Sequence, residues 1–89
     1  MFRKRLSIYD RFYLDEIRDA INQTVNKERD RIILHYKLVD GLTFEEIETI
    51  PLPDKRHPEG IYLSARQLQN IVYKYEDRVY GYLAKMNQQ

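Results

Sequence analysis

The chain has no cysteine, few glycines and prolines, and no long run of apolar residues. Without cysteine it can form neither a disulfide framework nor a thiolate zinc site, and it has no thiol nucleophile. No apolar run approaches the roughly 20 residues that a membrane-spanning helix needs. The basic residues 3–5 are not followed by the apolar segment of a signal peptide. We therefore expect a soluble cytoplasmic protein that has no membrane partner.

Residues typical of catalytic and metal sites are also scarce. The three glycines are scattered and cannot form a glycine-rich phosphate-binding loop. The two histidines, His35 and His57, do not have the spacing of metal ligands. Adjacent carboxylates such as Glu45 and Glu46 diverge around a helix and seldom share one site. We expect no enzymatic activity, no metal and no cofactor.

Charge is nearly balanced in total but unevenly distributed. Fifteen basic and 14 acidic residues give a formal net charge of +1, less than a simple electrostatic DNA binder would carry. Residues 1–5, 27–37 and 66–85 are net basic, whereas residues 10–19 and 40–48 are net acidic. This segregation can give a folded surface one basic side. The alternative is an ordinary mixed-charge surface.

Apolar periodicity predicts a single all-α domain over residues 1–89, with about four helices preceded by a basic arm at residues 1–8. The first helix is expected to begin at Tyr9 or Asp10, with Ser7 or Asp10 as its cap, and to end within residues 22–26. Its apolar positions include Leu14. We expect this helix to serve core packing.

Two further helices are predicted before residue 51. The second covers residues 27–39, with Asn26 as its cap and Gly41 as the left-handed residue after its end. The third covers residues 44–49. It opens with the capping box of Thr43 and Glu46, and Pro51 ends it.

Residues 51–63 form a proline-bearing insert, which we expect to be a loop. One interpretation is a β-like wing, or a loop that contacts the DNA phosphate backbone through Lys55, Arg56 and His57. The other is an ordinary solvated surface loop.

A long fourth helix is predicted from Ser64, which forms a second capping box with Gln67. Its apolar residues are spaced alternately four and three apart, as in a heptad seam. The distal half of this seam is expected to pack either on the first helix or on a second copy of the chain. We expect a homodimer, with an interface formed by Tyr75, Val79, Tyr82 and Met86.

The opposite side of the fourth helix is polar. Arginine suits guanine, asparagine and glutamine suit adenine, and lysine serves guanine or phosphate. Ser64 and the first backbone amides are expected to take a phosphate at the positive helix end. The alternative is a merely solvating face. The candidate residues for contacts with double-stranded DNA are Arg66, Gln67, Asn70, Tyr73 and Lys74.

Three segments resemble a known family. ERDRIIL (residues 28–34) followed by DGLTFEEI (40–47) is similar to region four of bacterial sigma factors and to the small sigma-like regulators of phages and prophages. SARQLQNI (64–71) resembles the recognition helix of that family, and YKYED (73–77) resembles its continuation in the phage members. The resemblance implies a helix-turn-helix that reads promoter DNA and contacts RNA polymerase. It places Arg66, Gln67, Asn70 and Lys74 against DNA, and Thr43 or Glu45 near phosphate.

The sequence departs from this family at residues 51–63, where family members join the two helices by a short turn. We expect a sequence-specific DNA-binding transcriptional regulator. The alternative is a helical protein-interaction module that binds RNA polymerase or another bacterial protein without DNA.

Overall fold

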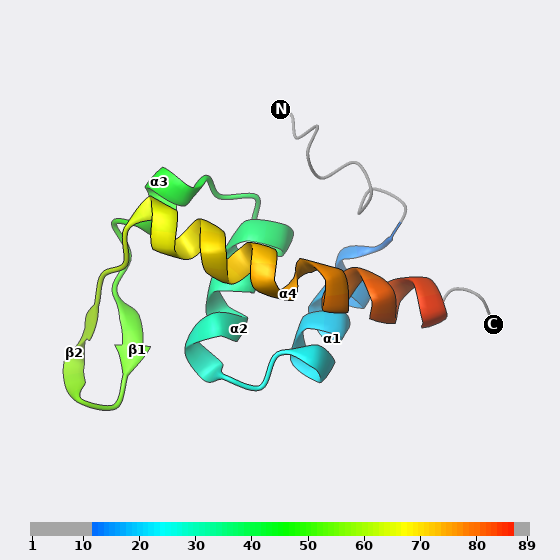
Figure 1. The fold of residues 1–89 in the computed structure, drawn as a ribbon, viewed down its shortest axis with the longest axis horizontal. Helices are drawn as coiled ribbons and strands as arrows, with labels where there is room; N and C mark the ends of the chain where they lie inside the picture. Colours follow the sequence, from blue (N-terminus) through cyan, green and yellow to red (C-terminus); the bar gives the residue numbers. More distant parts are fainter. Residues whose placement is uncertain (1–11, 87–89) are drawn as a thin grey trace.

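In the computed structural model, which describes residues 12–86, the chain is mostly helical and carries a small two-stranded sheet. Figure 1 shows α4 running across the shorter helices, with the β-hairpin to one side of them. The expectation of an all-α fold is correct for the helices but wrong for the hairpin. In chain order the elements are α1 (Leu14–Thr24), α2 (Glu28–Leu34), the π-helix η2 (His35–Val39), α3 (Phe44–Ile47), β1 (Leu52–Asp54), β2 (His57–Ile61) and α4 (Ala65–Met86).

Helix α1 begins at Leu14, later than predicted. The backbone N–H of Tyr13 donates to the Glu16 carboxylate at 2.9 Å, which satisfies one of the unpaired donors of the first turn. Leu14 was expected to be buried but is 53% exposed. The predicted caps Ser7 and Asp10, and the basic arm at residues 1–8, lie outside the described residues.

The second helix changes character along its length. Lys27, rather than the predicted Asn26, occupies the N-cap, and it makes no side-chain cap bond. From His35 the helix widens into a π-helix, in which the N–H of Asp40 donates to the carbonyl of His35. Gly41 then adopts a φ of 74°. The predicted left-handed helix stop at Gly41 is therefore confirmed.

Both predicted capping boxes are present. In the first, Thr43 N donates to Glu46 Oε1 at 2.8 Å and Glu46 N donates to Thr43 Oγ1 at 3.1 Å. In the second, Ser64 N donates to Gln67 Oε1 at 2.9 Å and Gln67 N donates to Ser64 Oγ at 3.2 Å. Each box satisfies two donors at a helix start. Helix α3 ends at Ile47 because residues 48 and 49 form a turn ahead of the proline.

The insert predicted as a loop is an antiparallel hairpin. Leu52 pairs with Ile61 and Asp54 pairs with His57, with an irregular register between the two pairs. Leu52 is buried and ties the hairpin to the core. Gly60 has a φ of +89°, and a Cβ there would lie 2.9 Å from the Cβ of Pro51. Of the interpretations considered, the β-like wing describes the shape of this segment.

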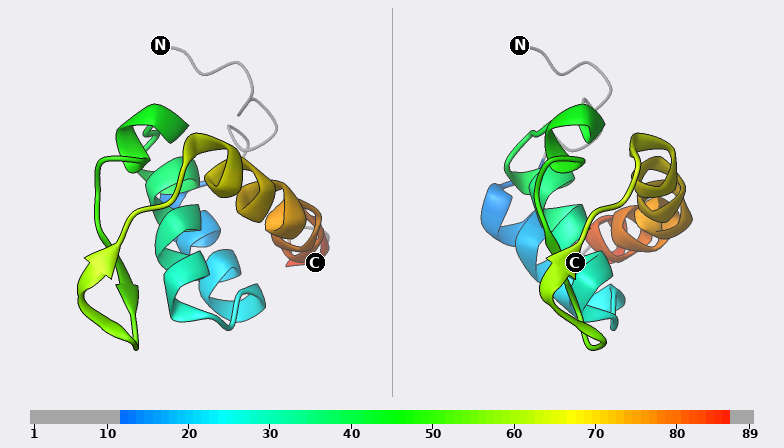
Figure 2. Two further views of the ribbon diagram at one scale, coloured as in Figure 1. Left: turned by 60° about the vertical axis from the view of Figure 1, so that its left-hand side comes forward. Right: turned by 90° about the vertical axis from the view of Figure 1, so that its left-hand side faces the viewer.

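The core lies where α4 packs on α1, α2 and α3. The two views of Figure 2 show α4 on one side of these elements. None of the helices within residues 12–86 is both long and apolar enough to cross a lipid bilayer. The buried residues of α1 are Ile17, Ala20 and Ile21, and those of α4 are Leu68, Val72, Tyr75, Val79 and Leu83.

The distal seam of α4 packs within the chain. Tyr75 and Val79 are buried in the core, and the hydroxyl of Tyr82 donates to Asp19 of α1 at 3.2 Å. Met86 is 51% exposed. Tyr75 and Val79 are therefore not available on the surface, which corrects the predicted dimer interface: Tyr75 bonds to Asp30 of α2, and Tyr82 to Asp19 of α1.

Candidate nucleic-acid interface

The polar face of α4 is the strongest candidate site. Arg66, Asn70, Tyr73 and Lys74 are all exposed. At 100° per residue they fall on one side of the helix, and Asn70 lies directly opposite the buried stripe. The structure therefore brings four of the five predicted α4 residues onto one accessible face. This arrangement can present hydrogen-bonding groups to the edges of bases.

Gln67 and Ser64 are engaged in the helix cap instead. The side-chain oxygen of Gln67 accepts hydrogen bonds from both the N–H and the hydroxyl of Ser64, at 2.9 and 3.2 Å. The Ser64 hydroxyl in turn accepts from Gln67 N. Gln67 is exposed, but its acceptor oxygen already has partners. Bidentate readout of adenine by Gln67, which also needs this oxygen, would require breaking the cap.

The start of α4 already holds a carboxylate. Glu48, in the turn that follows α3, accepts a hydrogen bond from the backbone N–H of Ala65 at 2.6 Å. A negative charge at this position interacts favourably with the helix dipole. It would repel a phosphate, which corrects the expectation that the free amides after Ser64 bind one. Sequence reasoning missed Glu48 because the contact depends on how α3 approaches α4.

The remaining predicted DNA contacts lie elsewhere. The Thr43 hydroxyl accepts the N–H of Glu46, so Thr43 is the N-cap of α3. Lys55 and Arg56 form the turn of the hairpin and are exposed. They line a pocket together with Lys27 and Arg29 rather than joining the polar face of α4. Local sequence patterns could not bring these residues together, because the two halves of the pocket are far apart in the chain.

A cationic cluster surrounds a buried pair of residues on the flank of α4. The hydroxyl of Tyr75 donates to Asp30, which is only 3% exposed, and Arg29 pairs with the same carboxylate at 3.1 Å. Burial raises the pKa of the Tyr75 hydroxyl, and the hydrogen bond to Asp30 raises it further. Lys74 Nζ and Arg78 Cζ lie 5.2 and 5.4 Å from the centre of the Tyr75 ring. Arg29 and Arg78 were not predicted as site residues.

The polar face also carries an acidic side chain, Asp77. It is exposed and lies two helical turns after Asn70, on the same side of α4. Residues 12–86 contain no group of three or more histidine or carboxylate side chains that could hold a metal ion.

No protein-family model, curated protein or solved structure matches the chain.

Proposed function

We propose that the protein is a sequence-specific DNA-binding transcriptional regulator whose recognition helix is α4. The observation that carries this proposal is the exposed face of Arg66, Asn70, Tyr73 and Lys74 on a helix whose opposite face is buried. Because the buried stripe fixes the rotation of α4, the polar residues have a defined direction. A defined direction is what base readout in a major groove requires.

The helix-turn-helix arrangement is part of the same proposal. Helix α3 is the supporting helix, and the hairpin stands where family members have a short turn. Two observations support this assignment: α3 packs on α4, and Glu48 bonds to the first turn of α4. The resemblance of residues 28–34, 40–47 and 64–71 to region four of sigma factors also favours it. On the same resemblance we propose RNA polymerase as a partner, a phage or prophage origin and a cytoplasmic location.

A homodimer on two adjacent half-sites would add the phosphate contacts that a weakly basic monomer lacks. Such a dimer would have to use a surface other than the one predicted, since Tyr75 and Val79 are occupied within the chain. Light scattering in the presence and absence of DNA tests for it.

The proposal is tested by titrating duplex fragments from the promoters of the protein's own locus. Binding should weaken steeply between about 50 and about 200 mM salt, because phosphate contacts release counterions. Asn70→Ala should cost about 1–3 kcal/mol at one base position and leave other positions unchanged. Gln23→Ala, which removes an exposed amide from α1, is the control. Absence of binding to every fragment, or equal losses for all base substitutions, would refute base readout by α4.

A protein-interaction module is the second candidate. Tyr13 and Tyr62 are 80% and 63% exposed, and tyrosine is enriched in protein interfaces. Retrieval of an RNA polymerase subunit from nuclease-treated bacterial lysate, combined with no affinity for DNA, would favour this function over the first. A subunit that is retrieved only when DNA is present would favour the first.

A further inference from the structure

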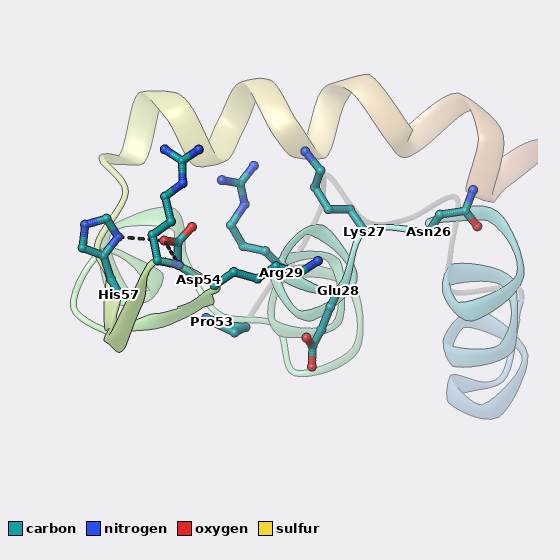
Figure 3. A pocket seen from close by; sticks show the side chains of 9 residues that line it. Asn26, Lys27, Glu28, Arg29, Pro53, Asp54 and His57 are labelled. Atoms are coloured by element: carbon teal, nitrogen blue, oxygen red, sulfur yellow. Dashed lines mark hydrogen bonds and ion pairs between the residues drawn. The ribbon is translucent and has the colours of Figure 1, made fainter.

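An open pocket lies between the start of α2 and the hairpin. Its volume is about 860 Å³, and residues 26–29 and 53–57 line it. Figure 3 shows the two walls facing each other, one from each segment. We call this pocket the α2–hairpin groove. The polar face of α4 contributes no residue to it, so the proposed base readout leaves the groove without a role.

The groove carries more positive than negative charge. Lys27, Arg29, Lys55 and Arg56 line it, against only two carboxylates. In Figure 3 the side chains of Lys27 and Arg29 extend to the same side of the groove, whereas Glu28 extends to the opposite side. The Glu28 carboxylate is therefore directed away from Lys27 and Arg29.

The second carboxylate, Asp54, is used to hold the hairpin turn. It accepts hydrogen bonds from His57 Nδ1 at 2.7 Å and from the backbone N–H of Arg56 at 3.1 Å. The hydrogen bond from His57 is the main reason why the pKa of Asp54 is lowered. An Asp side chain bonded to the N–H two residues on is a recurrent way to fix a turn. The position of Arg56 is thus set by the hairpin itself.

Part of the cationic charge is not used inside the molecule. Arg29 is paired with the buried Asp30. Within residues 12–86, no salt bridge engages Lys27, Lys55 or Arg56. These three side chains are exposed and come from both walls of the groove. They can neutralise an external anion without first breaking an internal ion pair.

The groove adjoins the cations of α4. Arg29 contacts Asp30, Asp30 accepts the hydroxyl of Tyr75, and Lys74 and Arg78 lie over the Tyr75 ring. Arg29 of the groove and Lys74 of the proposed reading face are therefore linked through Asp30 and Tyr75. An open groove lined by four cationic side chains fits an extended polyanion better than a small enclosed ligand.

We propose that the α2–hairpin groove binds the phosphate backbone of the duplex that α4 reads, through Lys27, Lys55 and Arg56. This inference rests on the proposed function. The hairpin then acts as a clamp that contributes affinity independently of base sequence, whereas α4 contributes the sequence preference.

The test compares two double variants that remove the same charge. Lys27→Ala with Arg56→Ala takes one cation from each wall, and Arg18→Ala with Lys85→Ala takes two cations from outside the groove. Duplex affinity is measured over a range of salt concentrations, on a preferred and on an unrelated sequence. The slope of log affinity against log salt should fall by about two for the groove variant, on both sequences, since each phosphate contact contributes about 0.9. The control should retain a slope close to the wild-type value. Circular dichroism checks that both variants fold.

Several outcomes would overturn the inference while leaving the proposed function intact. One is an unchanged slope for the groove variant, and another is an equal loss in both variants. A third is binding of inorganic tripolyphosphate in the groove, detected by NMR, at concentrations where duplex leaves the same resonances unmoved. Conversely, a groove effect without any base-specific effect of Asn70→Ala would refute base readout and retain the groove. A wild-type protein that binds no duplex would refute both.

Discussion

The hydroxyl of Tyr75 in α4 donates a hydrogen bond of 3.0 Å to the carboxylate of Asp30 in α2, across 45 residues of sequence. Both residues are buried, at 7% and 3% exposure. The carboxylate has one further partner among the described residues, the guanidinium of Arg29. This contact joins the long helix to the short ones and helps to set the direction in which Asn70 faces.

We expect Tyr75→Phe to lower the free energy of unfolding by about 1–3 kcal/mol, because it leaves a buried carboxylate without one of its donors. Tyr82→Phe is a matched control, since its hydroxyl bonds to the exposed Asp19, and its effect should be clearly smaller. Urea denaturation of both variants measures the difference. Equal effects would mean that the buried pair has no special role in stability.

Glu48→Ala should destabilise the protein by about 0.5–2 kcal/mol, as loss of a helix cap does, because Ala65 N then has no protein acceptor at the start of α4. Glu45→Ala, on the exposed side of α3, should change stability little. If phosphate competes with Glu48 for the start of α4, the same variant should bind duplex more tightly. Thermal melting and a DNA titration separate the two effects. A stability loss as large for Glu45→Ala would argue against the cap.

The glycines offer a pair of opposite predictions. Gly60→Ala should cost about 1–2 kcal/mol because an alanine at positive φ is strained, and its Cβ would meet Pro51. Gly81→Ala should instead stabilise α4 by about 1 kcal/mol, since a Cβ there meets nothing within 4 Å. Thermal unfolding of the two variants measures the expected loss and the expected gain of stability. Stabilisation by Gly60→Ala would show that the hairpin does not need this conformation.

Acidification should destabilise the fold through His35. Burial lowers the pKa of His35 below its ordinary value of 6.5, and the nearby Arg18 lowers it further. As pH falls through the unfolded-state value, the unfolded chain takes up a proton that the folded chain resists, so the free energy of unfolding decreases. His35→Gln should reduce the loss of melting temperature between about pH 7.5 and about pH 5.5. An identical pH dependence in the variant would contradict this prediction.

The sequence predicted the elements that depend on local chemistry. The capping boxes of Thr43 and Ser64 and the helix stop at Gly41 were predicted correctly, because each is decided by side chains within a few residues. The buried stripe of α4 was also predicted, because helical periodicity marks it. The same pattern could not identify what would cover the stripe: Tyr75 and Tyr82, which were assigned to a dimer, bond to α2 and α1.

Contacts between distant segments were not predictable from local patterns. Because Asp30 is charged, its local sequence predicts a surface position. Its burial depends on Tyr75, which lies far along the chain. The hairpin was considered only as one interpretation, a β-like wing, of a segment predicted as a loop, because a strand signal needs alternating apolar residues and only Leu52 and Ile61 provide it here. The α2–hairpin groove could be recognised only once the fold had placed Lys27 opposite Arg56.

The pairing of Leu52 with Ile61 has a consequence for how this protein can vary. The chain leaves the helical frame and returns to it at nearly the same point, so the turn at residues 55 and 56 is the part of the hairpin farthest from this base. We expect a change in the length of this turn to leave the angle at which α4 meets its neighbours unaltered, whereas a change in β1 would disturb its packing on α2. The same exposed turn is a natural place to graft a foreign peptide.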